Sequence, residues 1–280
     1  MEVIKTIKEM HTRISSIKDR KESIGFVPTM GALHEGHISL INNARNENKI
    51  IIVTIFVNPT QFNDKDDYDD YPHQLDEDIE IAEGAGVDIV FAPCVEELYP
   101  EGFCTYIEQT KLTGSLCGKS RPGHFRGVAT IVTKLFNILK PDRAYFGQKD
   151  YQQSVVIKRL VEDLNINIEI KVLPIVREED GLALSSRNKH LNPEERLSAP
   201  CIYNSLLRAQ SLFNSNEKNS ANIIREMASI INNAKHTKID YVSIVDLDTL
   251  EYIPQINGKA VASVAVYVGN TRLIDNIILE

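Results

Sequence analysis

Tryptophan is absent from this chain and cysteine is scarce. The four cysteines are irregularly spaced and include no Cys-x-x-Cys pair, which argues against a disulfide framework and a zinc site. No segment approaches the run of about 20 apolar residues that a membrane-spanning helix needs, and the first residues lack the apolar core of a signal peptide. These absences predict a globular, cytoplasmic protein with no membrane partner.

Basic residues are outnumbered, with 31 Lys and Arg against 39 Asp and Glu and a net charge of -8. Nucleic acids are bound chiefly through clustered Lys and Arg, so this balance predicts no nucleic-acid partner. A small anionic ligand stays compatible with the composition, because a local basic pocket can form on an acidic protein. The length of 280 residues suits one large domain and a smaller one.

The most informative stretch runs from Phe26 to Leu40, where an apolar strand passes through a glycine turn into a helix. Gly31 permits the turn and Gly36 permits close approach of a ligand, while unpaired N–H groups at the helix start attract anions. His34 and His37 lie three residues apart and can donate to a phosphate as charge builds on it. We interpret the stretch as a phosphate site; two ordinary surface histidines are the plain alternative.

A second stretch follows a buried strand. The β-branched run from Lys49 to Val57 is typical of a strand in a parallel sheet, and strand, helix and strand form a right-handed crossover. Asn58 to Phe62 then lie at the carboxyl end of that strand, where open α/β sheets bind ligands. The Gln61 amide can donate and accept at once, which suits a hydroxy acid, although a surface turn explains the same residues.

Acidic residues dominate the next part of the chain. Residues 63–71 hold five aspartates, which predicts an exposed, mobile loop that is either a flap over the site or simply solvated. A helix is expected over residues 73–85. Its Asp76, Glu77 and Asp78 are interpreted as a charged outer face rather than as magnesium ligands. A further helix is expected over Glu2 to Asp19.

Cations gather before the apolar helix expected over residues 128–139. Arg121, His124 and Arg126 lie within six residues of one another and suit either of two roles. They can hold a carboxylate or phosphate, or they can bridge a subunit interface, and the sequence leaves both open.

The pattern of strand, glycine turn and helix occurs again at Gly147 to Asp150. Gly147 allows a nucleotide to approach closely, and Lys149 supplies a point charge for its phosphates. The helix that follows presents Gln153 in its first turn. If the strands have the doubly wound order, this amide lies on the same side as Gln61.

We interpret the segment from Arg177 to Asn188 as a hinge that also contains residues suited to binding phosphates. Ser185, Ser186 and Arg187 can surround a triphosphate with donors, although such a tripeptide is common in loops. From Pro193 the composition shifts to two helices, expected at 193–213 and 220–234, and to strand-like segments. We therefore expect a first domain over residues 1–176, a hinge over 177–188 and a lid over 189–280.

Six separated segments, in order, resemble the pantothenate synthetase family, a member of the HIGH-type nucleotidyltransferase superfamily. They are Pro28 to His37, Phe56 to Phe62, Arg121 to Thr133, Phe146 to Gln153, Asp180 to Asn188, and Gly269 to Ile277. Glu179, Leu184 and His190 depart from the usual pattern without removing a polar group that the chemistry needs.

The resemblance implies a fold and an activity. The implied fold is α/β, a Rossmann-like doubly wound parallel sheet with a smaller C-terminal α+β lid domain. The implied reaction joins pantoate to β-alanine at the expense of ATP, through a pantoyl adenylate, with Mg²⁺ accompanying ATP and no metal ligand assigned to the protein. The family is commonly homodimeric. The alternative is a nucleotidyltransferase of the same superfamily that acts on another small acid or alcohol.

The resemblance also implies roles for particular residues. Gln61 and Gln153 would hold pantoate. The residues implied to act in catalysis are His37, His34, Lys149, Ser185, Ser186 and Arg187. The residues implied to bind ATP are Met30, Gly31, Ala32, Leu33, His34, Glu35, Gly36, His37, Gly147, Gln148, Lys149, Asp150, Val176, Leu184, Ser185, Ser186 and Arg187.

Overall fold

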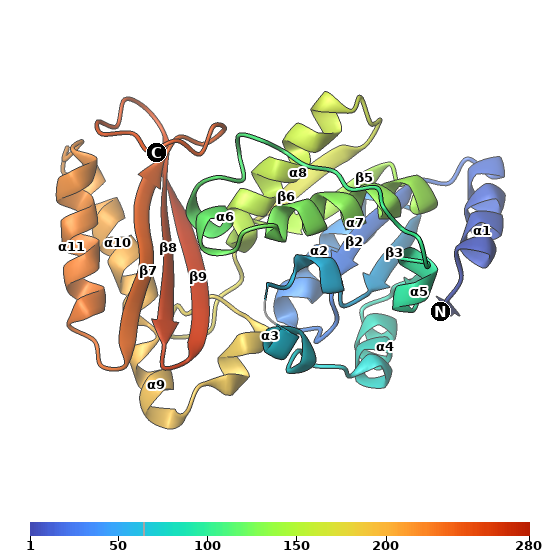
Figure 1. Cartoon of the computed structure of the whole chain (residues 1–280), viewed down its shortest axis with the longest axis horizontal. Coiled ribbons are helices and arrows are strands. Elements are labelled where there is room, and N and C mark those ends of the chain that lie inside the picture. Colours follow the sequence, from blue (N-terminus) through green and yellow to red (C-terminus); the bar gives the residue numbers. More distant parts are fainter. Residues whose placement is uncertain (64) are drawn as a thin grey trace. The chain divides into compact units, whose positions relative to one another are not determined.

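Six parallel strands form the central sheet of the N-terminal part of the chain in the computed structural model, which describes residues 1–63 and 65–280 (Figure 1). Their order is β1-β4-β3-β2-β5-β6, so the chain reverses its direction of travel across the sheet beside β2. The carboxyl ends of β2 and β5 meet at this switch point, where open α/β sheets bind ligands. The strands are β1 (Glu2–Ile4), β2 (Ile24–Thr29), β3 (Ile50–Ile55), β4 (Ile89–Phe91), β5 (Arg143–Gly147) and β6 (Glu169–Leu173).

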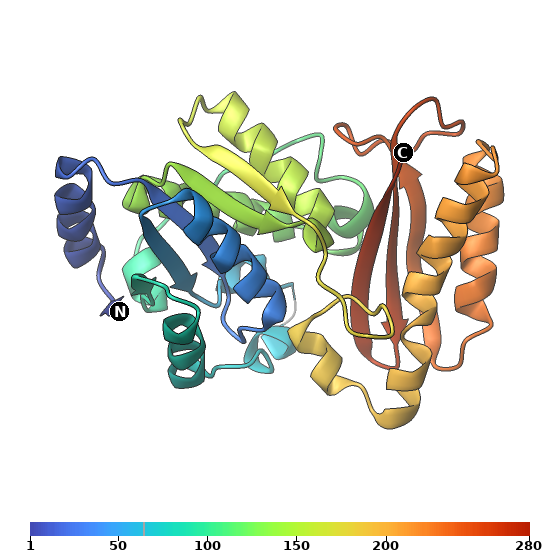
Figure 2. The ribbon, with the colours of Figure 1, turned by 180° about the vertical axis from the view of Figure 1, so that it is seen from behind.

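Helices cover both faces of this sheet, and apolar side chains explain the packing. Every residue of β3 is buried, as its β-branched sequence predicts. On one face, α2 (Glu35–Glu47) and α4 (Leu75–Gly84) contribute to a core with β2 and β3, and Figure 2 shows α2 there. On the other face lies α7 (His124–Leu139), whose Phe136 ring meets the Phe26 ring edge-on at 6.3 Å. The predicted Rossmann-like doubly wound sheet is confirmed.

Two expectations for the N-terminal part are wrong. Residues 2–19 are not one helix, because Glu2–Ile4 pairs with β4 and the Thr6 side chain caps a helix that begins at Ile7. Residues 63–71 are not simply an exposed loop. Lys65–Asp69 is helical and Tyr71 is buried with its ring 5.7 Å from that of Phe62, while position 64 lies outside the described residues. The remaining elements here are α1 (Ile7–Asp19), η1 (Pro59–Gln61), α3 (Lys65–Asp69) and α5 (Val95–Leu98).

The C-terminal part is an antiparallel three-stranded sheet covered by two helices, the predicted α+β arrangement. The strands β7 (Thr237–Val245), β8 (Ala260–Val268) and β9 (Thr271–Leu279) are adjacent in that order. Helices α10 (Cys201–Asn214) and α11 (Ser220–Asn232) bury Leu206 and Met227 in the same core (Figure 1). The single helix expected over 193–213 is divided instead, since α9 (Pro193–Ser198) ends before Pro200 and α10 follows it.

Contacts within the chain define two units. The first comprises residues 1–110, 121–147 and 156–173, and the second comprises 111–120, 148–155 and 174–280. Two short internal segments therefore join the C-terminal unit. They carry α6 (Leu116–Ser120), η2 (Gln148–Asp150) and the first residues of α8 (Tyr151–Asp163).

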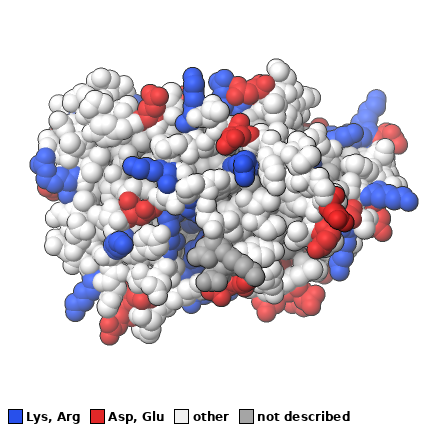
Figure 3. All heavy atoms as spheres, in the orientation of Figure 1, with Lys and Arg blue, Asp and Glu red and all other residues white. Residues whose placement is uncertain are grey.

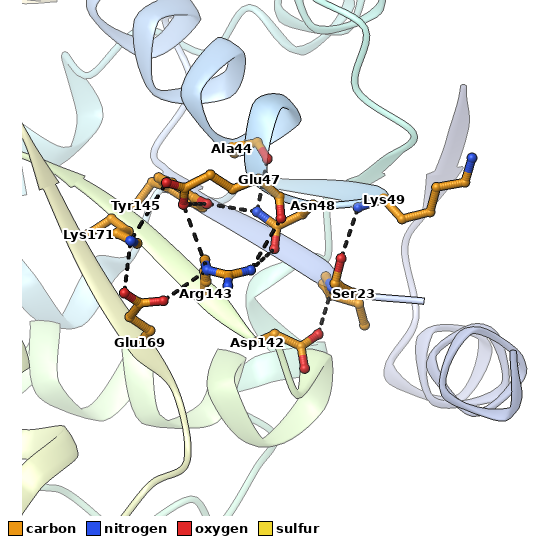
Figure 4. A network of polar contacts seen from close by, with 11 residues as sticks. Ser23, Ala44, Glu47, Asn48, Lys49, Asp142, Arg143, Tyr145, Glu169 and Lys171 are labelled. Carbon is orange, nitrogen blue, oxygen red and sulfur yellow. Dashed lines mark hydrogen bonds and ion pairs between the residues drawn. The ribbon is translucent and has the colours of Figure 1, made fainter. Parts of the chain in front are cut away.

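A polar network stabilises the amino ends of β5 and β6 (Figure 4). Arg143 and Lys171 both pair with Glu169, at 2.9 and 2.8 Å. The Tyr145 hydroxyl donates to Glu47 at 2.7 Å and accepts from Asn48 at 2.7 Å. These contacts lie near the amino ends of the strands, away from the carboxyl ends where ligands bind. We therefore assign them to the fold rather than to ligand binding.

Charged side chains of both signs are intermingled on the face that Figure 3 shows, among a larger area of uncharged atoms. Such mixing is expected when acidic residues exceed basic ones only modestly. Within residues 1–63 and 65–280, none of the helices combines the length and the apolar character needed to cross a bilayer.

Candidate active site

The turn between β2 and α2 has an unusual backbone. Gly31 has φ +85° and Ala32 has φ +51°, so two consecutive residues occupy the left-handed region. For a residue with a side chain this conformation is uncommon and costs free energy unless the surroundings hold it. Thr29 supports the turn, because its Oγ1 accepts from the Gly31 N–H at 3.2 Å and donates to the Thr54 carbonyl at 2.6 Å.

His34 and His37 form a reciprocal cap at the start of α2. The His34 Nδ1 accepts from the Gly36 N–H at 3.1 Å, and the His37 Nδ1 accepts from the His34 N–H at 3.3 Å. Because Nδ1 accepts in both rings, each neutral imidazole carries its proton on Nε2. The ring centroids are 4.2 Å apart. The pair thus carries two Nε2–H donors at the positive end of a helix, an arrangement suited to phosphate.

Gly36 is required for a reason that the sequence did not reveal. A Cβ at this position would lie 2.8 Å from Cε1 and 2.9 Å from Nδ1 of His34. The glycine therefore makes room for the capping ring itself.

Gln61 is buried at the carboxyl end of β3, and the structure brings it to Met30. Its Nε2 donates to the Met30 sulfur at 2.9 Å, and its Oε1 accepts from the Asn58 side chain at 2.9 Å. Asn58 is only 1% exposed and also accepts from the Tyr99 hydroxyl at 2.8 Å. Asn58 orients the predicted substrate amide, and sequence reasoning missed this role. Its place at the end of a buried strand was the available signal.

Two residues of the cluster Arg121, His124 and Arg126 contact the same turn. The His124 Nδ1 lies 2.8 Å from the Gln61 carbonyl oxygen, and an Arg121 Nη donates to that oxygen at 3.5 Å. Helix α7 can approach this closely because residue 127 is glycine, where a Cβ would be 2.4 Å from the Thr60 oxygen. Arg126 instead stacks over the Tyr106 ring, at 4.9 Å from its centroid. Arg121 and His124 thus support the Gln61 turn, and an interface role stays untested.

Strand β9 holds the second glycine turn, which comprises Gly147 to Asp150. The Asn276 side chain donates to the carbonyl oxygens of Gln148 and Lys149 at 2.9 and 3.1 Å, and it accepts from the Gln148 amide at 3.2 Å. Lys149 Nζ lies 3.8 Å from Asp150. At Gly147, a Cβ would meet no described atom within 4 Å. The protein itself therefore does not demand glycine there, which agrees with a ligand using the space.

The two adjacent glutamines of α8 have different surroundings. Gln152 is buried, accepts from the Cys117 N–H at 3.0 Å and donates to the Leu112 and Ser115 carbonyls, each at 2.9 Å. It therefore fixes the segment 111–120. Gln153 is half-buried, so it stays the candidate for substrate contact.

The hinge residues are held by local hydrogen bonds. The Leu184 N–H donates to the Val176 carbonyl at 3.0 Å, which places these two predicted ATP residues side by side. Ser185 caps the short helix η3 (Ser186–His190) by accepting from the Arg187 N–H at 3.3 Å. Nearby, Arg177 forms a bidentate ion pair with the buried Asp275, at 2.6 and 3.0 Å. Burial raises the pKa of Asp275 above the ordinary value, although Arg177 opposes the shift.

The expectation for the acidic start of α4 is wrong at one position. Asp76 and Glu77 are exposed, but Asp78 is only 1% exposed and points into the protein. Residues 1–63 and 65–280 contain no cluster of three or more His, Cys, Asp or Glu arranged to hold a metal ion.

Known proteins resemble this chain over its whole length. The family model for pantoate-beta-alanine ligase matches residues 2–278. The pantothenate synthetase of Moorella thermoacetica is 55% identical over 280 residues, covering 100% of this chain and 99% of the relative. That of Thermotoga petrophila is 53% identical over 279 residues, with 100% of both chains covered.

Solved structures agree. The crystal structure of pantothenate synthetase from Thermus thermophilus matches with a TM-score of 0.94 and 43% identity, covering 99% of both chains. The Francisella tularensis pantoate-beta-alanine ligase, in a complex with beta-gamma ATP and beta-alanine, matches with a TM-score of 0.83 and 42% identity, covering 99% of this chain and 97% of that one. The chain belongs to the pantoate-beta-alanine ligase family.

Proposed function

We propose that this ligase condenses pantoate with β-alanine in two steps. A carboxylate oxygen of pantoate attacks the α-phosphorus of ATP, the bond to the bridging oxygen breaks, and pyrophosphate leaves. The β-alanine nitrogen then attacks the carbonyl carbon of the pantoyl adenylate, loses a proton to solvent, and expels AMP. The protein forms no covalent bond to substrate in this scheme.

The observation that carries the proposal is the histidine pair at the start of α2. Both rings accept backbone N–H groups at Nδ1, which directs their protons to Nε2. Donors fixed in advance stabilise charge that develops on a phosphate without any reorganisation during the reaction. We assign His37 and His34 to the stabilisation of this charge, with the other residues of the Met30–His37 stretch contacting ATP.

The remaining roles divide between anion contacts and substrate contacts. Lys149, Ser185, Ser186 and Arg187 supply a point charge, two hydroxyls and a planar fork, which together suit phosphate oxygens. Gly147 to Asp150, Val176 and Leu184 complete the proposed ATP site. Gln61 and Gln153 hold the hydroxyl and carboxylate of pantoate, and Asn58 orients the first of these amides.

Several features of the proposal depend on the family rather than on this chain's contacts. We expect Mg²⁺ to accompany ATP, the chain to act as a homodimer, and residues 189–280 to act as a lid that excludes water from the adenylate. A cytoplasmic location fits a biosynthetic enzyme.

A product assay tests the function directly. The purified chain is mixed with ATP, Mg²⁺ and pantoate, with and without β-alanine, and AMP, pyrophosphate and pantothenate are followed together. Pyrophosphate formed on addition of pantoate, with equal AMP and pantothenate only when β-alanine is present, supports both half-reactions. Turnover of another acid or alcohol in place of pantoate would favour the nucleotidyltransferase alternative.

A further inference from the structure

Asp78 is a buried carboxylate with no assigned role. It lies in the first turn of α4 and is 1% exposed, whereas its neighbours Asp76 and Glu77 are exposed. Placing a carboxylate away from water costs free energy unless the protein supplies hydrogen bonds in return. The partners of Asp78 therefore indicate what the buried charge is for.

Both oxygens of Asp78 accept from the turn that precedes His34. Oδ2 accepts from the Ala32 N–H at 2.9 Å, and Oδ1 accepts from the Leu33 N–H at 2.7 Å. Two consecutive N–H groups thus point at one carboxylate that comes from 45 residues further along the chain. A carboxylate satisfies both donors at once, one with each oxygen.

The backbone of the turn shows why such support is needed. Gly31 and Ala32 both have positive φ, and Ala32 has no glycine-like freedom to adopt it. A Cβ at Gly31 would lie 2.8 Å from Asp78 Oδ2, so the carboxylate also fills the space beside the glycine. A left-handed residue persists only where the surroundings hold it, and Asp78 is the acidic side chain that holds this one.

Helix α2 begins directly after this turn. His34 follows Leu33 in the chain, and its N–H is the donor that His37 accepts. Any rotation of the Leu33 peptide therefore changes the direction of both imidazole rings.

We propose that Asp78 is a positioning residue for adenylation, one that fixes the Gly31–Leu33 backbone and through it the rings of His34 and His37. The proposal rests on the proposed ATP site. Asp78 touches neither substrate nor the reacting atoms in this scheme.

The variant Asp78→Asn tests the proposal with little change in shape. Asparagine keeps one acceptor, but its NH₂ would face the N–H of Ala32 or Leu33, so one of the two hydrogen bonds is lost. We expect kcat/KM for ATP in pyrophosphate release to fall about tenfold or more, as for a lost hydrogen bond to a charged acceptor. The thermal midpoint should not fall in proportion, because the substitution also removes a buried charge.

Two matched controls lie on the same helical turn. Asp76→Asn and Glu77→Gln remove exposed charges at neighbouring positions and should leave kcat/KM for ATP unchanged at pH values where Asp78 is ionised. Wild-type kinetics in Asp78→Asn would overturn the proposal. So would a fall in the thermal midpoint that accounts for the whole loss of activity.

Hydrogen exchange supplies a test that needs neither turnover nor a variant. In the isotope-labelled wild-type chain, the amides of Ala32 and Leu33 should exchange slowly with solvent, and rapid exchange of both would contradict the hydrogen bonds to Asp78. Calorimetry with a non-hydrolysable ATP analogue then compares wild type with Asp78→Asn. If the wild-type chain binds the analogue but makes no pantothenate, the proposed function fails; equal analogue affinity in the two proteins refutes the positioning role.

Discussion

The two histidines cap a helix and have a proposed chemical role, and substitution can separate the two. His37 closes the cap of α2 by accepting from the His34 N–H. His37→Ala removes both the cap and the imidazole, so it should lose adenylation and about 1 kcal/mol of stability, typical of a lost cap. His37→Gln should lose adenylation alone, because a glutamine at this position can still accept from the N-cap N–H.

Single-turnover pyrophosphate release and thermal unfolding, measured on both His37 variants, check this prediction. Adenylation at the wild-type rate in His37→Gln would show that the ring contributes only the cap.

Titration of Asp78 predicts a pH dependence. Burial raises its pKa above the ordinary value for aspartate, the N–H groups of Leu33 and Ala32 oppose the shift, and the nearby Glu77 charge adds to it. As pH falls through this raised pKa, the carboxyl gains a proton and one acceptor becomes a donor. The KM for ATP should therefore rise on the acid side. The sign is opposite for stability, because a raised folded-state pKa means that protonation of this group favours the fold.

The measurement is the KM for ATP against pH in wild type, Asp78→Asn and Glu77→Gln. Gln74 is the other side chain that acts on Asp78, and it carries no charge. The rise in the KM for ATP at low pH, the acid limb of the profile, should disappear in Asp78→Asn. In Glu77→Gln it should move to lower pH, because a like charge has been removed. An identical limb in all three proteins would assign it to another group.

The sequence predicted some site residues and not their partners. His34 and Gln61 were singled out by their places after strands and Met30 by the family resemblance, and Met30 and Gln61 prove to be in contact. Asp78 was assigned to the outer face of its helix, because three consecutive acidic residues look alike until the fold shows which one points inward. Asn58 was missed although it follows a buried strand, since two of its partners, Gly127 and Tyr99, lie far away in the sequence.

At the scale of elements, β9 links the C-terminal sheet to the second glycine turn. Asn276 is 2% exposed, and its side chain donates to two backbone carbonyls there. Asn276→Ala leaves both carbonyls without that donor, which should cost about 1–3 kcal/mol. Because one of these carbonyls belongs to Lys149, the KM for ATP should rise as well.

Chemical denaturation and ATP kinetics test Asn276→Ala, with Asn232→Ala at the exposed end of α11 as the control. A destabilised variant with an unchanged KM for ATP would mean that Asn276 serves the fold and not the orientation of Lys149.

Elements with a regular pattern were predictable, and elements defined by distant partners were not. The apolar run of β3 and the glycine turn into α2 are local signals. Strand β1 is only three residues long and exists because β4 lies beside it. Strand β9 buries the polar residues Asp275 and Asn276, so its sequence does not alternate regularly between apolar and polar residues. Arg177 and η2 supply the hydrogen-bond partners of these two side chains.

At the scale of the whole molecule, each unit has a hydrophobic core of its own. Ile41 and Val53 lie in a core of the first unit, and Leu206 and Met227 lie in a core of the second. Composition alone could not predict that residues 111–120 and 148–155 join the second unit, because their membership depends on contacts such as those of Gln152.

The separate cores predict that damage to one unit leaves the other folded. Leu206 is fully buried in α10, and truncation of such a side chain costs about 2–5 kcal/mol. Leu206→Ala should therefore accelerate hydrogen exchange in α10, α11 and β7 to β9, while the parallel sheet keeps its protection. Activity should be lost with the second unit, because that unit carries Lys149 and Arg187, the two proposed phosphate contacts.

The neighbouring residue supplies the control for this experiment. Leu207 is 44% exposed on the same helix, so Leu207→Ala removes the same number of atoms without opening a cavity in the core. Its hydrogen exchange should match that of the wild type. Equal loss of protection in both units of Leu206→Ala would show that they unfold as one cooperative body. In that case the loss of activity would reflect global unfolding rather than unfolding of the second unit alone.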